Sequence, residues 1–156
     1  METLAQAGSI AQEFVRTEGL LPHRFRIVLA DDHLDILREV RALLTPEFEI
    51  VNAVTDGLQL IDAVREARPD VVVSDLQMPG LGGMAACRRI IKEGWCNAVV
   101  VLTMHNEAQL IDEAIAAKIR GYVLKMDAGD ELVRAVRNVL SGSTYCSCGT
   151  RRARGR

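Results

Sequence analysis

Aromatic side chains are scarce in this sequence of 156 residues: one Trp, two Tyr and three Phe amount to 4% of the chain. Hydrophobic residues of all kinds nevertheless make up 49% of it. The core must therefore be built from Val, Leu, Ile and Ala, a composition that suits helices packed on a parallel sheet. The length is that of about one domain.

Long apolar runs are absent as well. No stretch approaches the roughly 20 consecutive apolar residues that a membrane-spanning helix needs. The opening residues, METLAQAGSIAQEFVRTEG, lack a basic region followed by a continuous apolar block, so they do not have the form of a secretory signal. We therefore expect a cytoplasmic protein without a membrane partner.

The cysteines are not spaced for metal binding. Cys87, Cys96, Cys146 and Cys148 include no CxxC pair, and no histidine stands near them at zinc-ligand spacing. Cys87 falls on the apolar face of a predicted helix and is expected to be a small core residue. The CxC pair near the end of the chain is a weak signal for metal or redox chemistry.

Charge is unevenly distributed along the chain. Residues 149–156 contain four Arg and no acid, so the rest of the chain carries 15 basic residues against 21 acidic ones. An acidic body is not typical of a protein that binds nucleic acid. The basic segment is short and is expected to be a tail.

Short apolar runs alternate with segments of helical periodicity. The predicted strands are 27–30 (IVLA), 48–54 (FEIVNAV), 71–75 (VVVSD), 98–102 (AVVVL) and 121–124 (GYVL), and each is followed by a predicted helix. Parallel strands need crossover helices, so this alternation predicts an α/β fold. We expect a doubly wound, five-stranded parallel sheet, (βα)5, with strand order 2-1-3-4-5.

Polar residues are predicted to cap three of the helices. Asp56 precedes the second helix and Asn106 the fourth, and Asp127 followed by Asp130 approximates a capping box before the last. Pro69 ends the second helix. The fourth helix is expected to run through Leu110, Ile111, Ala114 and Ile115, and the last helix is expected to place Leu132, Val133, Val136 and Leu140 on its inner face.

Polar side chains stand at the carboxyl ends of four predicted strands. Asp31 and Asp32 follow the first strand, Asp75 ends the third, Thr103 follows the fourth and Lys125 follows the fifth. The carboxyl ends of parallel strands share one edge of the sheet, where ligands of open α/β folds bind. We therefore expect these five side chains to converge, although each alone could be an ordinary cap or loop residue.

Three neighbouring carboxylates repel each other unless a cation lies between them, and hard oxygen ligands select Mg²⁺. Asp32 and Asp75 are the candidate direct ligands, with Asp31 binding directly or through water and the backbone carbonyl of Gln77 completing the set. Asp75 could then attack a phosphorus atom in line and form an acyl phosphate. The Lys125 ammonium would contact one phosphoryl oxygen and the Thr103 hydroxyl another.

The segments VLADDH, VVVSDLQMPGLGG, VVVLTMHNE and GYVLKMDAGDEL together resemble the receiver domain of response regulators, over residues 25–143. The resemblance implies a CheY-like, or flavodoxin-like, fold and a two-component phosphorelay in which a sensor histidine kinase phosphorylates Asp75. It also implies Mg²⁺ at Asp31, Asp32 and Asp75. Tyr122 matches the aromatic switch residue, whose ring would swing inward when Thr103 moves; the alternative is a plain half-buried strand aromatic.

The amino-acid sequences of these segments are most similar to those of receivers of LuxR-type transcriptional regulators. Such regulators carry a helix-turn-helix domain after a linker. Only 16 residues follow Leu140, whereas such a domain needs roughly 50–70. We therefore expect no DNA binding by this chain as given. It is either part of a transcription regulator or a stand-alone receiver that acts through protein contacts, with a homodimer as one form of output.

The expected domains are an N-terminal extension (1–24), the receiver domain (25–143) and a basic tail or truncated linker (144–156). Ile10, Phe14 and Val15 in the extension are spaced like one face of a helix.

Before the fifth strand the family commonly has Gly-Ala, where this chain has Lys118 and Ile119. A left-handed helix exit at a lysine would cost up to about 1 kcal/mol.

Gln77 and His105 stand two residues past Asp75 and Thr103, so both are predicted to tune the lifetime of the phosphoryl group; His105 could instead be an exposed loop residue. Met104 is large for its place beside the site and could restrict access of the phosphoryl donor.

An Mg²⁺-dependent phosphohydrolase is the remote alternative. Such enzymes carry an acid two residues after the nucleophile, where Gln77 cannot transfer a proton, so we expect no turnover beyond the chain's own phosphoryl transfer and dephosphorylation.

Overall fold

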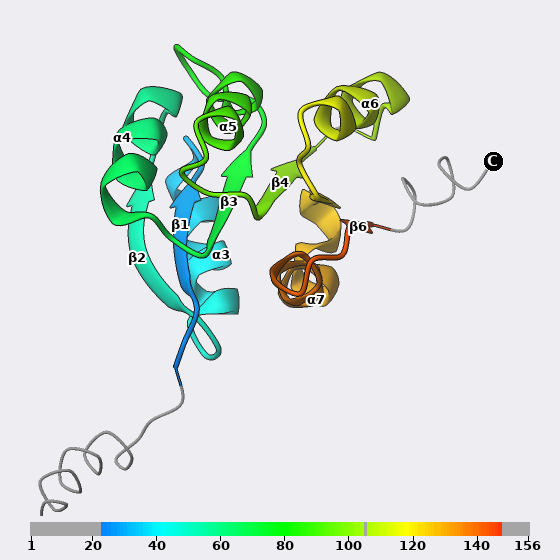
Figure 1. The fold of residues 1–156 in the computed structure, drawn as a ribbon. Coiled ribbons are helices and arrows are strands. Elements are labelled where there is room, and N and C mark those ends of the chain that lie inside the picture. The colour runs from blue at the N-terminus through cyan, green and yellow to red at the C-terminus, as the bar shows by residue number, and fades with distance from the viewer. Residues whose placement is uncertain (1–22, 105, 148–156) are drawn as a thin grey trace, which may run out of the picture.

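Six parallel strands form one sheet, in the order β2-β1-β3-β4-β5-β6 (Figure 1). The structure is a computed structural model, and it describes residues 23–104 and 106–147. The strands are β1 (Arg26–Ala30), β2 (Glu49–Val54), β3 (Val71–Asp75), β4 (Val99–Thr103), β5 (Gly121–Leu124) and β6 (Tyr145–Cys146). The helices are α3 (Leu34–Leu44), α4 (Gly57–Ala67), α5 (Gly83–Lys92), α6 (Ala108–Ala116) and α7 (Ala128–Leu140), with a 3-10 turn, η2 (Lys125–Asp127), before α7.

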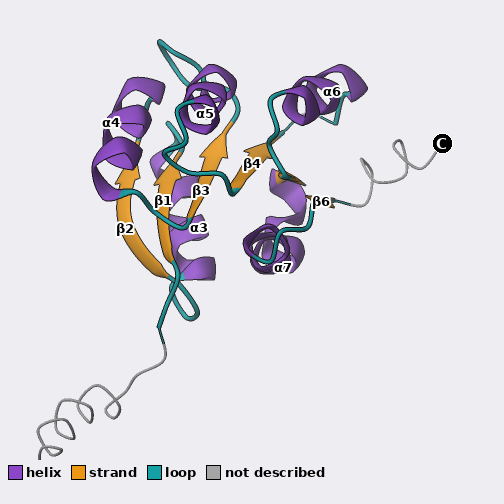
Figure 2. Ribbon diagram, in the orientation of Figure 1, coloured by secondary structure: helices purple, strands orange, loops and turns teal. Residues whose placement is uncertain are grey.

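Helices cover both faces of the sheet: α4, α5 and α6 lie on one side, and α3 and α7 on the other (Figure 2). Successive residues of β1 enter opposite cores, Ile27 and Leu29 on the α3 side and Val28 and Ala30 on the α4 side. Burying one Val, Leu or Ile side chain is worth about 1.5–3 kcal/mol. Strands β3 and β4 are buried at every position, so two cores meet at these central strands.

The predicted α/β fold and strand order are confirmed, and the sheet has one strand more than the five expected. The additional strand, β6, pairs in parallel with β5 and consists of Tyr145 and Cys146 alone. Two residues flanked by Ser, Gly and Thr give no periodic signal, so the sequence did not predict this strand. None of the helices within residues 23–147 that the structure describes is long and apolar enough to cross a lipid bilayer.

One of the three predicted helix caps has the expected hydrogen bond. The Asp56 carboxylate accepts from the backbone N–H of Gln59 at 2.8 Å. The prediction for Asn106 was wrong, because α6 begins one residue later, after Glu107. Asp127 does precede α7, but η2 leads directly into that helix, and the Asp127 side chain makes no capping bond. The expected capping box is therefore absent at this helix.

The last two helices bury most strongly the residues near the middle of their inner faces. In α6, Ile111 and Ala114 are buried and Ile115 is 49% exposed. In α7, Leu132 and Val136 are fully buried. Val133 and Leu140 are only partly buried, and Ala135 and Val139 fill the interior beside them.

The turn after α6 has the left-handed conformation that the sequence analysis considered for Lys118. Lys118 has φ 68°, and its N–H donates to the Ile115 carbonyl at 2.9 Å. The next N–H, of Ile119, donates to the Ala114 carbonyl at 2.9 Å. These two bonds close the helix end, and they hold a lysine where glycine would be the less strained residue.

Candidate functional site

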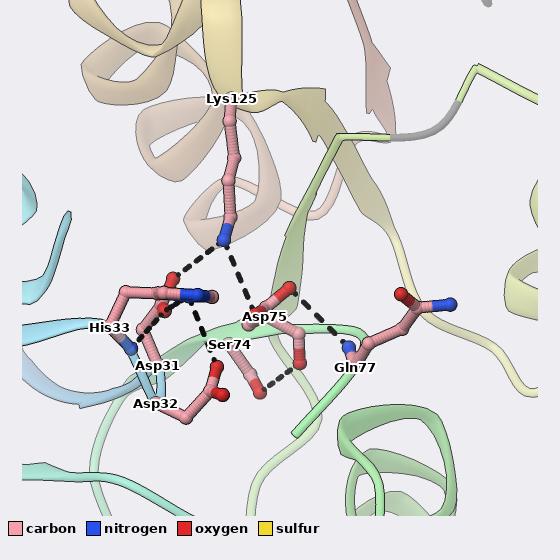
Figure 3. Close-up of polar contacts among 7 residues, drawn as sticks. All are labelled: Asp31, Asp32, His33, Ser74, Asp75, Gln77 and Lys125. Carbon is pink, nitrogen blue, oxygen red and sulfur yellow. Dashed lines mark hydrogen bonds and ion pairs between the residues drawn. The ribbon is translucent and has the colours of Figure 1, made fainter. Parts of the chain in front are cut away.

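Four of the predicted side chains meet at the carboxyl edge of the sheet (Figure 3). The Lys125 ammonium, just past β5, lies 3.0 Å from Oδ2 of Asp31 and 3.2 Å from Oδ2 of Asp75. Asp31 and Asp32 follow β1, and one oxygen of each lies 3.3 Å from Nδ1 of His33. The structure thus joins the ends of three separate strands in one polar cluster.

Local backbone contacts fix the acid pair. The Asp31 N–H donates to the Val54 carbonyl at 3.1 Å, which extends the pairing of β1 with β2 to the end of the strand. The Asp31 carboxylate in turn accepts from the His33 N–H at 2.9 Å. This turn starts α3 at Leu34 and leaves the Asp31 side chain facing Lys125.

Asp75 is held at its backbone by two neighbours. The Ser74 hydroxyl donates to the Asp75 carbonyl at 2.8 Å. Gly83, the first residue of α5, packs so closely that a Cβ atom there would lie 1.8 Å from the same carbonyl oxygen. Only a glycine allows the loop after Asp75 to turn back onto the strand at this distance.

Charge and burial act together on the cluster. Burial raises the pKa of Asp75 above its ordinary value, and the nearby Asp31 carboxylate adds to this effect, although Lys125 and the Gln77 N–H oppose it. Burial alone would lower the pKa of Lys125, but hydrogen bonds and attraction to Asp31 and Asp75 outweigh it and raise that pKa. One buried lysine therefore does not fully compensate the carboxylates.

The donor atoms of the cluster fit a divalent cation. Oxygen or nitrogen atoms of Asp31, Asp32, His33 and Asp75 lie within 4.8 Å of one another. Oδ2 of Asp31 is buried against the Lys125 ammonium, and Oδ1 of Asp32 is buried 3.3 Å from Nδ1 of His33, so neither oxygen is exposed to water. Buried carboxylate oxygens gathered in this way are the ligands that a hard cation prefers, so this acidic cluster could bind a divalent ion.

His33 is a member of this cluster that the sequence reasoning did not single out. Its imidazole is 67% exposed and lies beside both carboxylates of the acid pair. The only available signal was its place directly after Asp32 in the chain. That signal is weak, because the direction of the ring depends on the turn that starts α3.

Thr103 and Tyr122 lie on the neighbouring strands. Thr103 is 1% exposed, and it pairs in register with Leu124 of β5. Burial raises the pKa of Tyr122 to about 12, against the lowering effect of a hydrogen bond between its hydroxyl and the Thr103 side chain. The Tyr122 ring is only 3% exposed. The ring is therefore buried in this conformation, and its movement with Thr103 stays a prediction.

Of the remaining predicted residues, Gln77 and Met104 are exposed. The Gln77 N–H donates to Oδ1 of Asp75 at 3.4 Å, and its exposed side chain points away from the acids (Figure 3). Met104 is 74% exposed, so its side chain extends into solvent. His105 lies outside the described residues.

The fold and site define the class of protein. Residues 27–137 match the family model of the response regulator receiver domain. This match covers well over half of the chain, and the chain therefore belongs to the response regulator receiver family.

Curated relatives agree with this assignment. The transcriptional regulatory protein DegU of Brevibacillus brevis is 32% identical over 130 residues, which are 82% of this chain and 55% of DegU. The oxygen regulatory protein NreC of Staphylococcus carnosus is 31% identical over 123 residues, 77% of this chain and 57% of NreC. The chain thus spans little more than half the length of these relatives.

Solved structures share the fold. A LuxR-family two-component response regulator from Aurantimonas sp. superposes with a TM-score of 0.78 at 31% identity, over 86% of this chain and all of that one. The RcsB response regulator of Salmonella typhimurium superposes with a TM-score of 0.77 at 26% identity, over 84% of this chain and 67% of RcsB. This chain is therefore similar to receivers of the LuxR type.

Proposed function

We propose that this chain is a phosphorylation-controlled switch in which Asp75 accepts a phosphoryl group from a sensor histidine kinase. The observation that carries the proposal is the ion pairing of Lys125 with both Asp31 and Asp75 in a pocket assembled from three strand ends. A buried acid next to a buried cation is the pair that acyl phosphate formation requires, one group to attack and one to bind the transferred oxygens.

The transfer would proceed as an in-line displacement. A carboxylate oxygen of Asp75 attacks the phosphorus atom, and the bond from phosphorus to the leaving group breaks with its electron pair on that group. The Lys125 ammonium, which is already beside Asp75, contacts a phosphoryl oxygen, and the Thr103 hydroxyl donates to another. Hydrolysis of the acyl phosphate later restores Asp75, so we propose no turnover of other substrates.

Mg²⁺ is the proposed cofactor of this transfer. The carboxylates of Asp32 and Asp75 would hold it, with Asp31 directly or through water and the backbone carbonyl of Gln77. Its chemistry would be to offset the negative charge of the carboxylates and the arriving phosphoryl group. The clustering of carboxylate oxygens from Asp31, Asp32 and Asp75 supports this assignment.

For the output we propose transcription regulation by a longer protein that contains this receiver, since the relatives include regulators named as transcriptional. The alternative is a stand-alone receiver whose output is a protein contact, with a homodimer as one form. We propose residues 25–143 as the receiver domain, with β6 as an addition to its sheet, and no direct DNA contact by this domain. The tuning roles of Gln77 and His105, and the switch role of Tyr122, remain predictions.

Mass measurement after incubation with acetyl phosphate and Mg²⁺ tests the proposal. The wild-type chain should gain the mass of one phosphoryl group, and Asp75→Asn should gain none. Asp112→Asn, which alters an exposed acid on α6, is the matched control and should label normally. Labelling of Asp75→Asn at the wild-type level would refute the proposed acceptor.

A further inference from the structure

The chain returns to the sheet after its last helix. Residues 145–147, which we call the strap, include β6 (Figure 1) and pair with the outer edge of β5. The Tyr145 N–H donates to the Arg120 carbonyl at 2.9 Å, and the Ser147 N–H donates to the Tyr122 carbonyl at 2.9 Å. The strap therefore occupies an edge that would otherwise carry unpaired backbone groups.

Burial and side-chain contacts fix the strap in place. Tyr145 is 7% exposed, Cys146 is 8% exposed and Ser147 is completely buried. The Tyr145 ring enters the core beside α7, and its hydroxyl donates to Oε1 of Glu131 at 2.7 Å. Cys146 enters the opposite core. The strap is thus packed on both faces of the sheet rather than laid on its surface.

The end of the strap reaches the part of β5 that carries the functional residues. The Ser147 hydroxyl accepts from the Leu124 N–H at 3.3 Å, and Leu124 directly precedes Lys125. The Ser147 N–H holds the carbonyl of Tyr122. One serine therefore contacts the backbone on both sides of Val123, between the switch tyrosine and the phosphate-binding lysine of the proposed function.

We infer that Ser147 is a positioning residue for Lys125, so that attachment of the strap and phosphorylation of Asp75 strengthen each other. The inference rests on the proposed function. A phosphoryl group would bind Lys125 and fix the end of β5, which would hold the Leu124 N–H in place for Ser147. By reciprocity, an attached strap would hold Lys125 in place for the phosphoryl group.

This arrangement gives the switch a physical route to its C-terminal side. Ser147, at the C-terminal end of the strap, lies one hydrogen bond away from the residue before Lys125. A change in the order of the β5 backbone would therefore change the order of the strap at Ser147. Any domain that follows in a longer protein would receive the signal at this point.

Binding of beryllofluoride, a phosphoryl mimic, to the full chain in the presence of Mg²⁺ tests the inference by calorimetric titration. Ser147→Ala should weaken binding roughly threefold to tenfold, the scale of one hydrogen bond. Ser143→Ala, an exposed serine in the same segment, should bind like the wild type. Ser147→Thr retains a hydroxyl and should recover most of the loss.

A double-mutant cycle separates positioning from general destabilisation. In the Lys125→Ala background, Ser147→Ala should have little further effect on beryllofluoride binding. An equal loss in both backgrounds, or no loss in the wild-type background, overturns the inference. If Ser147→Ala does not fold, Tyr145→Phe removes the hydroxyl that bonds to Glu131 and Arg134 and should show a smaller weakening that also depends on Lys125. Wild-type affinity in that variant then overturns the inference.

The two proposals fail in different ways. If the wild-type chain neither binds beryllofluoride nor accepts a phosphoryl group, the proposed function fails and this inference fails with it. If the wild-type chain does both but Ser147→Ala binds as tightly as Ser143→Ala, only the inference fails.

Discussion

The ammonium group of Lys125 lies 3.2 Å from Oδ2 of Asp75, and this contact joins the end of β5 to the end of β3 across the intervening strand β4. The two residues are 50 positions apart in the sequence. Only the parallel sheet brings them together, because each stands at or just after the carboxyl end of its strand. A change of charge at one of these residues therefore acts directly on a side chain at the end of the other strand.

Loss of the lysine charge should destabilise the metal-free protein. Lys125→Met leaves the carboxylates of Asp31 and Asp75 buried without their shared cation, and we expect the free energy of unfolding to fall by roughly 1–3 kcal/mol. Urea unfolding in a chelator would measure this, and added Mg²⁺ should recover part of the loss. Lys92→Met, an exposed lysine on α5, is the control. Equal stability of Lys125→Met and wild type would show that the pairing contributes nothing.

Removal of the Asp75 charge should have the opposite effect. The folded-state pKa of Asp75 is raised, so the folded protein binds this proton more readily than the unfolded chain does. Ionised Asp75 therefore lowers stability as pH rises from the unfolded pKa, near 3.8, through the folded value. At neutral pH in a chelator, Asp75→Asn should raise the free energy of unfolding by on the order of 1 kcal/mol.

Two measurements check this prediction. The stability gain of Asp75→Asn should disappear as the pH is lowered below the unfolded pKa, because the wild-type acid is then protonated in both states. The gain should also shrink when Mg²⁺ is added at neutral pH, since the wild type would bind the ion more tightly. A variant that is less stable than the wild type at neutral pH would contradict the assigned direction of the pKa shift.

Gly83→Ala should displace the backbone of Asp75, the proposed acceptor, through a direct steric clash. A Cβ atom at this position would lie 1.8 Å from the Asp75 carbonyl oxygen, so either α5 or the end of β3 must move. We expect reduced phosphoryl labelling and a loss of stability of about 1–3 kcal/mol. Gly129→Ala in α7 has open space around its Cβ position and should be neutral or stabilising by up to about 1 kcal/mol. Normal phosphoryl labelling of Gly83→Ala would show that the close contact of Gly83 with the Asp75 carbonyl does not position Asp75.

Two helix-start residues should differ in their contribution to stability. Asp56→Ala removes a carboxylate that accepts the Gln59 N–H, and it should cost about 1 kcal/mol. Asn106→Ala should cost almost nothing, because α6 begins after Glu107 and Asn106 is exposed. Thermal or urea unfolding of both variants compares them under the same conditions. A cost for Asn106→Ala as large as that for Asp56→Ala would contradict the observed start of α6.

The strand ends explain why much of the site could be predicted from the sequence. Asp31, Asp75 and Lys125 each stand at or just after the end of a short, mostly apolar strand, and parallel topology then leaves little freedom in where their backbones lie. Their mutual contacts follow from strand order alone. The Asp56 cap was predictable for a similar reason, because its hydrogen bond is formed within one turn of helix.

Other features depend on contacts that no local pattern encodes. The strand at Tyr145 exists because β5 offers a free edge and the core beside α7 accepts the ring. The inward position of Tyr122 depends on its packing in the core beside α6, and the position of the His33 ring depends on the turn around Asp31. Each of these is a choice between conformations of similar local energy, which tertiary packing decides.

Location of the phosphoryl group on the chain tests the central claim most directly. Borohydride reduction of the acyl phosphate after treatment with acetyl phosphate and Mg²⁺, followed by peptide mass analysis, converts the modified aspartate to homoserine and identifies it. The reduced residue should be Asp75 alone. Reduction at Asp31 or Asp32, or at no aspartate in a chain that has gained phosphate, would contradict the account.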